Sequence, residues 1–403
     1  MAAPWLRRCQ FGTRKAALAN VFNARIALEN DPVTQHLLGF DEMLQTAVLF
    51  HEPGAPDQVF QEPRPLQDID VIRMQIRMQE QGLMTMGLDS VRNAVDEVAR
   101  GNSYHPLRDY LEGLEWDGVK RINVWLISKL GCEPTPYAQR IGEMFLISMV
   151  ARIMQPGCKA DYMVILESPQ GEMKSLACRT LAEPWFSDSL PDISTSAKDA
   201  SLHLRGKWLV EISEMHAFSR AEANHLKSFI SRQEERYRPP YGHQDIIEPR
   251  QCVFIGTTNK DIYLLDETGN RRFWPVKTGV MFAINIAGLR EDRDQLFAEA
   301  MVAFREGRAW WPDADFEVKE IRPQQDSRYD EDAWIEKAAP FLKASVHATV
   351  GDVAREALHI PIERLGRREQ VRIINILKTL GWQSGRRGPN GERRYYPPGS
   401  EQL

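Results

Sequence analysis

The chain has 403 residues, of which 43% are hydrophobic and 27% charged, and this is the composition of an ordinary soluble protein with room for two or three domains. Its five cysteines form no C-x-x-C pair, so the sequence predicts neither a zinc site nor a disulfide framework and favours a reducing cytoplasm. The net charge of -5 argues against a protein that binds nucleic acid non-specifically over its whole surface. The absence of a long uncharged apolar run argues against a membrane protein or an exported one.

Residues 1 to 100 are expected to form a helical N-terminal domain. Residues 21–50 carry apolar side chains at helical spacing, interrupted at Asp31-Pro32, and the Pro-rich residues 50–67 are typical of a loop. Residues 68–102 predict two more helices, the first ending near Gly82. A helical bundle or a winged-helix-like domain is the fold that these patterns favour.

Residues 101–325 are expected to form an α/β domain with a helical lead-in that extends to about residue 157. The last part of the lead-in, residues 137–157, has the pattern of a buried helix that ends at Pro156-Gly157. Four apolar runs follow, separated by helical or loop segments: YMVILE, KWLVEI, QCVFIGTTN and RRFWPVKT. Strands that alternate with helices predict a largely parallel sheet.

Residues 163–175, MVILESPQGEMKS, have the layout of a phosphate-binding loop between a strand and a helix. Gly171 would let the backbone turn, Lys174 would face the β- and γ-phosphates, and Ser175 would offer a hydroxyl to Mg²⁺. The standard pattern G-x-x-x-x-G-K-[ST] has glycine where Ser168 and Met173 stand, so on this motif alone a plain turn with a surface Lys-Ser pair is an equally good interpretation. The candidate nucleotide-binding residues are Ser168, Pro169, Gln170, Gly171, Glu172, Met173, Lys174 and Ser175.

Three later segments supply the other parts of a nucleotide site, and each has an ordinary structural alternative. The strand WLVEISE contains Glu211 and Glu214, one of which could hold the Mg²⁺ shell while the other polarises the attacking water. The strand FIGTTN ends in a polar cluster whose last member, Asn259, could sense the γ-phosphate, although such a cluster is also a common turn. Arg271 and Arg272 follow a Gly-Asn turn and could neutralise transition-state charge in cis or from a neighbouring subunit, or they could simply be solvated.

The tail, residues 331–403, is expected to form a basic winged-helix domain. From Phe341 onward it contains 11 Lys and Arg residues against 6 Asp and Glu, so this segment is basic on an otherwise acidic chain. A helical stretch, a basic amphipathic helix over residues 367–382 and a hairpin signal at Pro389-Asn390-Gly391 follow in the order of a winged helix.

Taken together, residues 100 to 310 resemble the virulence-associated protein E family, which comprises P-loop ATPases of phages, plasmids and genomic islands related to superfamily 3 helicases. The motifs that carry the resemblance are NSYHPLRDYLEGLEWDG, LESPQGEMKS, WFSDSLPDI, LRGKWLVEISEM, RPPYG, CVFIGTTN and TGNRRFWPV. The resemblance implies an AAA+-like core, ATP and Mg²⁺ as cofactors, and a homo-oligomeric ring, with a hexamer as one candidate size. It also implies that the strand with Glu211 is the Walker B segment, that Asn259 is the sensor, and that Arg271 or Arg272 is the arginine finger. A bacterial host cytoplasm and a separately encoded primase as partner are further expectations.

Two segments are candidates for contact with single-stranded or forked DNA. In relatives of superfamily 3 a hairpin between the acidic strand and the sensor strand points into the ring pore, and here that interval offers Arg238, Tyr241 and His243 as phosphate contacts and a stacking surface. The tail hairpin adds a second, salt-sensitive set of phosphate contacts, namely Arg386, Arg387, Arg393 and Arg394. A structural Pro-rich hairpin and a protein-binding winged helix remain the alternatives for these two segments.

The main hypothesis is a DNA-dependent ATPase, a helicase-like motor of phage or mobile-element replication. Its catalytic residues would be Lys174, Glu211, Glu214, Asn259, Arg271 and Arg272, and Ser175 and Glu211 would support Mg²⁺. One alternative is a DNA-binding or assembly protein that binds nucleotide without hydrolysing it, because Glu172 would repel a phosphate if it pointed inward. A phosphotransferase acting on a small molecule is a third reading, for which no acceptor pocket is visible in the sequence.

Overall fold

A computed structural model describes residues 3–193, 196–214, 220–238, 244–264, 270–328, 334–387 and 392–398. The chain divides into two compact units, Met1–Arg328 and Tyr329–Leu403. The first unit contains separate hydrophobic cores for its N-terminal part and for the region after residue 105, and the second unit has a core of its own.

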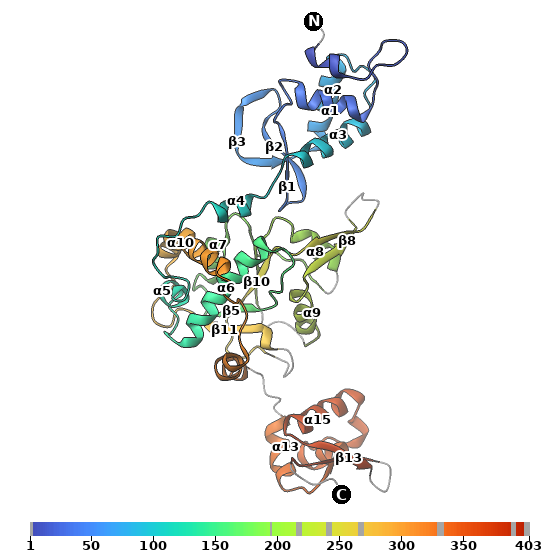
Figure 1. Ribbon diagram of the computed structural model, residues 1–403. Helices are drawn as coiled ribbons and strands as arrows, with labels where there is room; N and C mark the ends of the chain where they lie inside the picture. Colours follow the sequence, from blue (N-terminus) through green and yellow to red (C-terminus); the bar gives the residue numbers. More distant parts are fainter. Residues whose placement is uncertain are drawn as a thin grey trace. The chain divides into compact units, whose positions relative to one another are not determined.

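The N-terminal part of the first unit combines three helices with a four-stranded sheet (Figure 1). Its elements are η1 (Pro4–Arg8), α1 (Val21–Asn30), β1 (Leu38–Asp41), β2 (Thr46–Glu52), β3 (Ala55–Pro65), α2 (Asp68–Glu80), α3 (Leu88–Gly101) and β4 (Ser103–Tyr104). The strands β1, β2 and β3 form an antiparallel meander, and β4 joins β1 in parallel, giving the order β3-β2-β1-β4.

The helical pattern expected over residues 21–50 is therefore wrong from residue 38 onward, and the loop expected over residues 50–67 is wrong for β3. Asp41 explains the first turn, because its Oδ1 accepts the backbone N–H groups of Met43 and Leu44 at 2.7 and 2.9 Å and reverses the chain between β1 and β2. The apolar side chains that suggested a helix instead alternate across short strands, and Leu38, Phe40 and Leu49 enter the core formed with the helices. The helices predicted from residue 68 onward are confirmed as α2 and α3.

The centre of the first unit is a parallel five-stranded sheet with helices on both faces. Its elements are α4 (Pro106–Glu112), α5 (Trp125–Leu130), α6 (Pro136–Met154), β5 (Met163–Glu167), α7 (Lys174–Ala182), β6 (Phe186–Ser187), α8 (Ala197–His203), β7 (Leu209–Ile212), α9 (Arg220–Ile230), β8 (Glu234–Tyr237), β9 (Ile246–Pro249), β10 (Val253–Thr258), η3 (Asn270–Arg272), β11 (Phe273–Lys277), α10 (Ile286–Arg305), α11 (Ala314–Phe316), η4 (Glu317–Ile321) and α12 (Arg322–Asp326). The strand order is β11-β5-β10-β7-β6, and every pairing is parallel. The predicted α/β class with a parallel sheet is confirmed.

Alternating side chains divide the sheet between two cores. One core places α6, α7 and α10 against Val164, Leu209 and Ile255, and the other places α8 and α9 against Val210 and Phe254. Strands that are covered on both faces must be apolar throughout, which is why these runs are so readily visible in the sequence. Because all five strands run the same way, the segments that follow them meet at one edge of the sheet.

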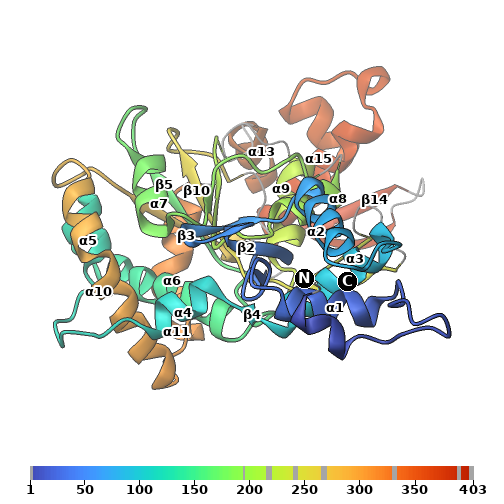
Figure 2. The same ribbon diagram turned by 90° about the horizontal axis from the view of Figure 1, so that it is seen from above.

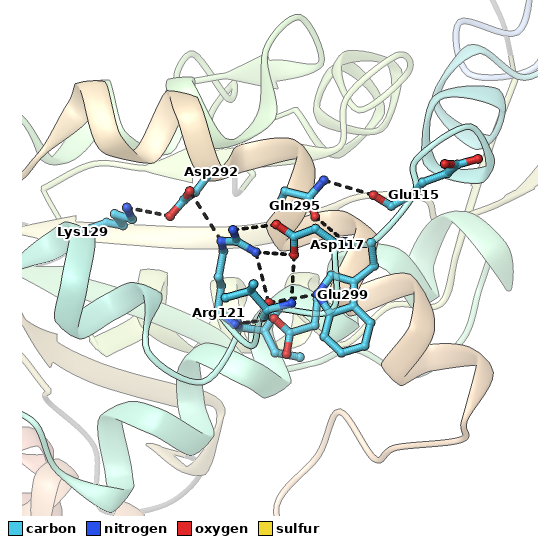
Figure 3. A network of polar contacts seen from close by, with 10 residues as sticks. Glu115, Asp117, Arg121, Lys129, Asp292, Gln295 and Glu299 are labelled. Carbon is cyan, nitrogen blue, oxygen red and sulfur yellow. Dashed lines mark hydrogen bonds and ion pairs between the residues drawn. The ribbon is translucent and has the colours of Figure 1, made fainter.

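The lead-in segment 113–124 has no regular structure and is fixed to α10 by polar contacts (Figure 3). Glu299 accepts the backbone N–H groups of Arg121 and Ile122 at 2.5 and 2.9 Å, and the Arg121 side chain bonds Asp117 at 2.8 Å. Asp292 on the same helix bonds Lys129 at 2.6 Å, which explains why α5 lies alongside α10 in Figure 2. The motif LEWDG therefore serves here to position the lead-in on the core.

His105 connects the N-terminal part to the sheet. It begins α4, where Nδ1 accepts the Arg108 backbone N–H at 3.1 Å, so Nε2 carries the proton and donates to Gln251 Oε1 at 2.7 Å. The side chain is buried, and burial lowers the pKa of this imidazole below its ordinary value of 6.5, although the Gln251 bond opposes the shift. A second connection joins the Gly206 N–H to the Met43 carbonyl at 2.8 Å.

This histidine predicts a loss of stability in mild acid. Above pH 6.5 His105 is neutral in both states, whereas below it the unfolded chain takes up the proton first, so the free energy of unfolding falls until the lower folded pKa is reached. His105→Asn, which keeps a capping acceptor, should remove this part of the pH dependence, as measured by urea unfolding between about pH 7 and pH 5. An unchanged pH dependence in the variant would contradict the assignment.

The second unit packs short helices against a three-stranded antiparallel sheet. Its elements are α13 (Trp334–Lys343), β12 (Ala348–Thr349), α14 (Val350–Asp352), η5 (Val353–Ala357), η6 (Ile362–Arg364), α15 (Arg367–Thr379), β13 (Gln383–Arg387) and β14 (Arg393–Tyr396). The sheet order is β12-β14-β13, so β13 and β14 form the hairpin that the sequence predicted, with its tip outside the described residues.

Candidate functional site

The segment 168–173 connects β5 to α7 and forms an open loop at the carboxyl edge of the sheet. Gly171 adopts φ +91°, a conformation that favours glycine, and Met173 precedes the first residue of α7 without a side-chain cap. The first backbone N–H groups of α7 therefore lack an intrahelical acceptor, and the helix dipole places partial positive charge there. Both features favour an anion at this position.

Lys174 directs its ammonium group back over this loop. Its Nζ donates to the Ser168 carbonyl at 2.7 Å, to Ser168 Oγ at 3.0 Å and to the Pro169 carbonyl at 3.0 Å. Burial lowers the pKa of Lys174, while the nearby carboxylates of Glu172 and Glu211 act in the opposite direction. The amine is thus held above the helix terminus, where a phosphate would be bound.

The two missing glycines have different consequences. Ser168 has no positive φ, so its backbone does not require glycine, and its hydroxyl contributes a partner to Lys174. Met173 adopts φ +57°, which costs an L-residue about 1–2 kcal/mol, and its side chain is exposed. The departure at Met173 therefore carries a conformational cost, and the one at Ser168 does not.

Glu211 occupies the centre of the site. It lies in β7 on the face that also carries Leu209, and its Oε1 accepts from Ser175 Oγ at 2.6 Å and from Thr257 Oγ1 at 2.7 Å. The residue is only 1% exposed, and among the described residues its Oε2 has no hydrogen-bond partner. A buried carboxylate oxygen without a donor is costly, and a cation with its water shell would satisfy it.

A cavity of about 360 Å³ lies beside the loop, and Glu211 is connected to it through Ser175 and Thr257, which line it. It is lined by residues 170–176 of the loop and first turn, by Ser213 and Glu214 after β7, and by residues 257–259 at the end of β10. Glu214 is exposed and has φ +54°, an uncommon conformation that often marks functional positions. The structure thus brings Lys174, Ser175, Glu211, Glu214 and Asn259 to one edge of the sheet.

Arg271 and Arg272 do not reach this cavity within one chain. They directly precede β11, whose first residue Phe273 pairs with Met163 at the start of β5, whereas the loop follows the end of β5. Arg272 Nε donates to Ser231 Oγ at 2.7 Å, and Arg271 is exposed. The two arginines therefore lie at the amino edge of the sheet, opposite the loop.

A second buried network, which the sequence did not reveal, fixes the residue just before the loop. Glu167 accepts from Arg328 Nε and Nη2 at 2.9 and 2.8 Å and from the Tyr263 hydroxyl at 2.7 Å. Its carbonyl accepts the Thr278 N–H at 2.8 Å. The signal that could have indicated a buried partner is the lone acid at the end of an otherwise apolar strand.

The interval between β7 and β10 contains the predicted hairpin. β8 and β9 pair antiparallel, and Tyr237 and Arg205 both donate to the Glu248 carboxylate at 2.5 Å. Arg238 follows β8, whereas Tyr241 and His243 lie outside the described residues.

The basic residues of the tail lie on its hairpin. Arg387 pairs with Arg393 across β13 and β14, Arg386 lies in β13, and Arg394 bonds Glu392 at 2.9 Å. Arg387 and Arg393 are exposed. A cationic pair on one hairpin suits contact with phosphates.

No group of three or more His, Cys, Asp or Glu residues in the described part of the chain is arranged to hold a metal ion. None of the helices in the same part has both the length and the apolar character that crossing a membrane requires.

A family model, the virulence-associated protein E-like domain, matches residues 111–330, which is more than half of the chain. The chain belongs to this family. The matched VapE-like segment contains the five-stranded sheet, the loop at Lys174 and the network around Glu167.

Solved structures similar to this chain include the apo form of the C-terminal region of NrS-1, residues 305–718, which is 14% identical over 90% of this chain and 96% of that one with a TM-score of 0.41. Two structures of the A form of the same region are 14% and 13% identical with TM-scores of 0.42, and each covers 90% of this chain and 96% of the other. No curated protein matches the chain.

Proposed function

We propose that this VapE-like protein is a Mg²⁺-dependent ATPase with an AAA+-like P-loop core that acts as a DNA-dependent motor in phage or mobile-element replication. The observation that carries the proposal is the convergence of Lys174, Ser175 and Glu211 at one edge of a parallel sheet. Each of these side chains alone has a structural explanation. Their joint placement around a helix amino terminus and a cavity is what a triphosphate site needs.

Each residue of the site has a separate role in the proposed hydrolysis. The α7 terminus and Lys174 would bind the β- and γ-phosphates, and Ser175 and Glu211 would hold Mg²⁺, which when bound would neutralise charge on the phosphate oxygens. Glu214, exposed at the cavity, orients and polarises the attacking water, and the Asn259 amide contacts the γ-phosphate. The unsatisfied Oε2 of Glu211 fits a cation with its water shell, because no described donor occupies that oxygen.

The position of Arg271 and Arg272 supports a homo-oligomer. Because they lie at the edge opposite their own loop, a role for them as arginine fingers requires the site of a second copy. Such an exchange is characteristic of rings in which each subunit completes its neighbour's site. We accordingly propose a ring, with the mass of the assembly to be measured directly.

Two hairpins supply the DNA-binding part of the proposal. In the β8–β9 hairpin, Arg238 directly follows β8, and in the second unit Arg387 and Arg393 are exposed on the β13–β14 hairpin, which we propose to be the wing of a winged helix. Single-stranded or forked DNA is the partner that such cationic hairpins suit, through phosphate contacts and base stacking.

The non-hydrolysing alternative rests on Glu172 and Met173. Glu172 is part of the cavity lining, and the strained Met173 raises the cost of forming the loop. The Glu172 carboxylate, however, lies beside Gly279, with Oε2 3.7 Å from the position of a Cβ there. Nucleotide binding without turnover would favour this alternative.

A strand-displacement assay tests the motor directly. On a forked DNA substrate we expect release of the shorter strand with ATP and Mg²⁺, and no release when a non-hydrolysable ATP analogue replaces ATP. Equal displacement with the analogue would show strand capture by binding alone and would contradict a motor.

A further inference from the structure

We infer that the beginning of the chain forms a binding surface for single-stranded nucleic acid, separate from the two hairpins proposed above. The surface is built on a short N-terminal hairpin, residues 10–18, and on the start of α1. It lies outside residues 111–330, the segment that the family model matches, and it gives the N-terminal part a role that the nucleotide site does not explain.

Charge is strongly segregated in this part of the chain. Residues 1–28 contain five Lys and Arg residues and no Asp or Glu, whereas residues 29–104 contain five Lys and Arg against thirteen Asp and Glu. Arg25 is neutralised by Glu29 and Glu97, with N–O distances of 3.8 and 3.3 Å. The other four cations are exposed and have no acidic partner among the described residues: Arg7, Arg8, Arg14 and Lys15. A surface of this charge attracts a polyanion.

The N-terminal hairpin is fixed to α1 by a buried asparagine. Its two arms pair antiparallel at Phe11 and Ala17. Asn23, which is fully buried, donates to the carbonyls of Gln10 and Leu18 at 2.8 Å and accepts the Gln10 N–H at 2.7 Å, so it holds both arms. Because the backbone of the hairpin is held in one arrangement, binding a ligand there costs less conformational entropy.

Lys15 occupies a position of this hairpin where glycine is expected. Its N–H donates to the Gly12 carbonyl at 2.9 Å, which closes the turn, and its own φ is +59°. In hairpins with a three-residue loop, the residue after the turn adopts this left-handed conformation and glycine suits it best, because an L-side chain there costs free energy. An exposed cation at a strained position is therefore better explained by what it binds than by the fold.

Two phenylalanines beside the cations supply surfaces for bases. Phe11 in the first arm is 50% exposed, and Phe22 in the first turn of α1 is 38% exposed. Aromatic faces stack on any base, and cations next to them follow the phosphate backbone, so this combination suits sequence-independent binding of a single strand. In a duplex the bases stack on one another and are not available to the two rings.

The order of side chains along the hairpin disfavours a lipid bilayer as the occupant. The residues of the tip, Thr13, Arg14 and Lys15, are exposed and polar, whereas Phe11 and Leu18 lie on the arms. Insertion into a bilayer would bring the charged tip into the lipid, which costs free energy. Nucleic acid needs cations that reach phosphates and rings beside them that accept bases, and the hairpin offers both.

The test measures the affinity of the full chain for an oligothymidylate of about 15 nucleotides at several salt concentrations, by fluorescence anisotropy without ATP. The double variant Arg14→Gln/Lys15→Gly removes two cations and relieves the backbone at residue 15. Its Kd should rise by about tenfold, and the slope of log K against log[salt] should become shallower by about 1.4, since each single-strand phosphate contact contributes about 0.7. Its urea midpoint should stay equal or rise, which separates lost binding from lost folding.

Arg73→Gln/Arg92→Gln is the matched control, because it removes two exposed cations from the same part of the chain, each of which lies beside an acidic group. It should leave both the affinity and the slope near those of the unsubstituted protein. Phe11→Leu keeps an apolar side chain and changes no charge. It should weaken oligothymidylate binding by about fivefold or more and leave duplex binding unchanged.

Unchanged affinity and slope in the Arg14→Gln/Lys15→Gly variant, or an equal loss in the control, would overturn the strand-binding surface. Binding to phosphatidylserine vesicles that Phe11→Leu abolishes, with oligothymidylate binding unaffected, would overturn it in favour of a membrane. None of these measurements involves ATP. A protein without ATP turnover would therefore contradict the proposed function and leave the N-terminal surface intact, and the reverse result would do the opposite.

Discussion

Lys174→Ala is expected to lower ATP turnover by about 100-fold or more, since it removes the cation that faces the transferred phosphate. The Lys174 ammonium is held by the Ser168 and Pro169 carbonyls and by Ser168 Oγ at 2.7–3.0 Å. A bound phosphate would accept the hydrogen bonds that Lys174 now donates to Ser168 and Pro169. Steady-state phosphate release at saturating ATP measures the effect.

Lys159→Ala is the matched control for this prediction. Its side chain is 66% exposed and its Nζ lies 3.9 Å from Asp161, so its removal takes away one surface cation of the same type. Turnover should stay near that of the unsubstituted protein. Turnover by Lys174→Ala equal to the control would remove the loop from the catalytic site.

Glu211→Gln is expected to separate binding from hydrolysis. The glutamine Oε1 can still accept from Ser175 and Thr257, so the two hydrogen bonds at 2.6 and 2.7 Å can keep their geometry. The negative charge at the position of Oε2 is lost, and with it the support for Mg²⁺. Turnover should fall by about 100-fold or more, while ATP still binds through α7 and Lys174.

Glu172→Gln neutralises a second carboxylate, one that lines the cavity beside Lys174, and serves for comparison. Glu172 lies beside Gly279 at the loop, whereas the side chains of Ser175 and Thr257 donate their hydrogen bonds to Glu211. Its neutralisation should leave turnover at least as high as before. A larger loss in Glu172→Gln than in Glu211→Gln would show that the acid in the loop, and not the one in β7, supports the metal.

The sequence predicted the central sheet well because its strands are buried on both faces. The runs MVILE, LVEI, VFIGTT and FWPVK became β5, β7, β10 and β11. Burial on both faces demands continuous apolar residues, and such runs are recognisable without knowing their partners. The helix ending before Pro156-Gly157 was recognisable for the same reason.

The N-terminal meander was missed because the pattern of β1 and β2 is ambiguous and because β3 (Ala55–Pro65) is polar and Pro-rich, as a loop would be. In residues 38–52 apolar side chains at spacings of two, three and four coexist, and a helix and a pair of strands fit almost equally well. Asp41 and the four-residue turn decide in favour of strands. In α15 the helix was predicted correctly, and Ile373, Ile376 and Leu377 are buried in the core of the second unit.

The network around Glu167 could not be derived from spacing. Glu167 and Arg328 are 161 residues apart and meet because β5 and the end of α12 lie together in the fold. For Arg271 and Arg272 the sequence predicted the position next to a strand. Only the parallel pairing of β11 with β5 shows at which edge of the sheet they lie. Long-range partners and edges follow from topology, which local patterns do not contain.

ATP hydrolysis with and without single-stranded DNA, with the mass of the oligomer determined in the same samples, tests the central claim most directly. We predict Mg²⁺-dependent turnover that single-stranded DNA increases and that Lys174→Ala abolishes, in an assembly larger than one chain. Binding of ATP and DNA by the unsubstituted protein without turnover at any DNA concentration would contradict the claim and would identify a nucleotide-binding protein that does not hydrolyse its ligand.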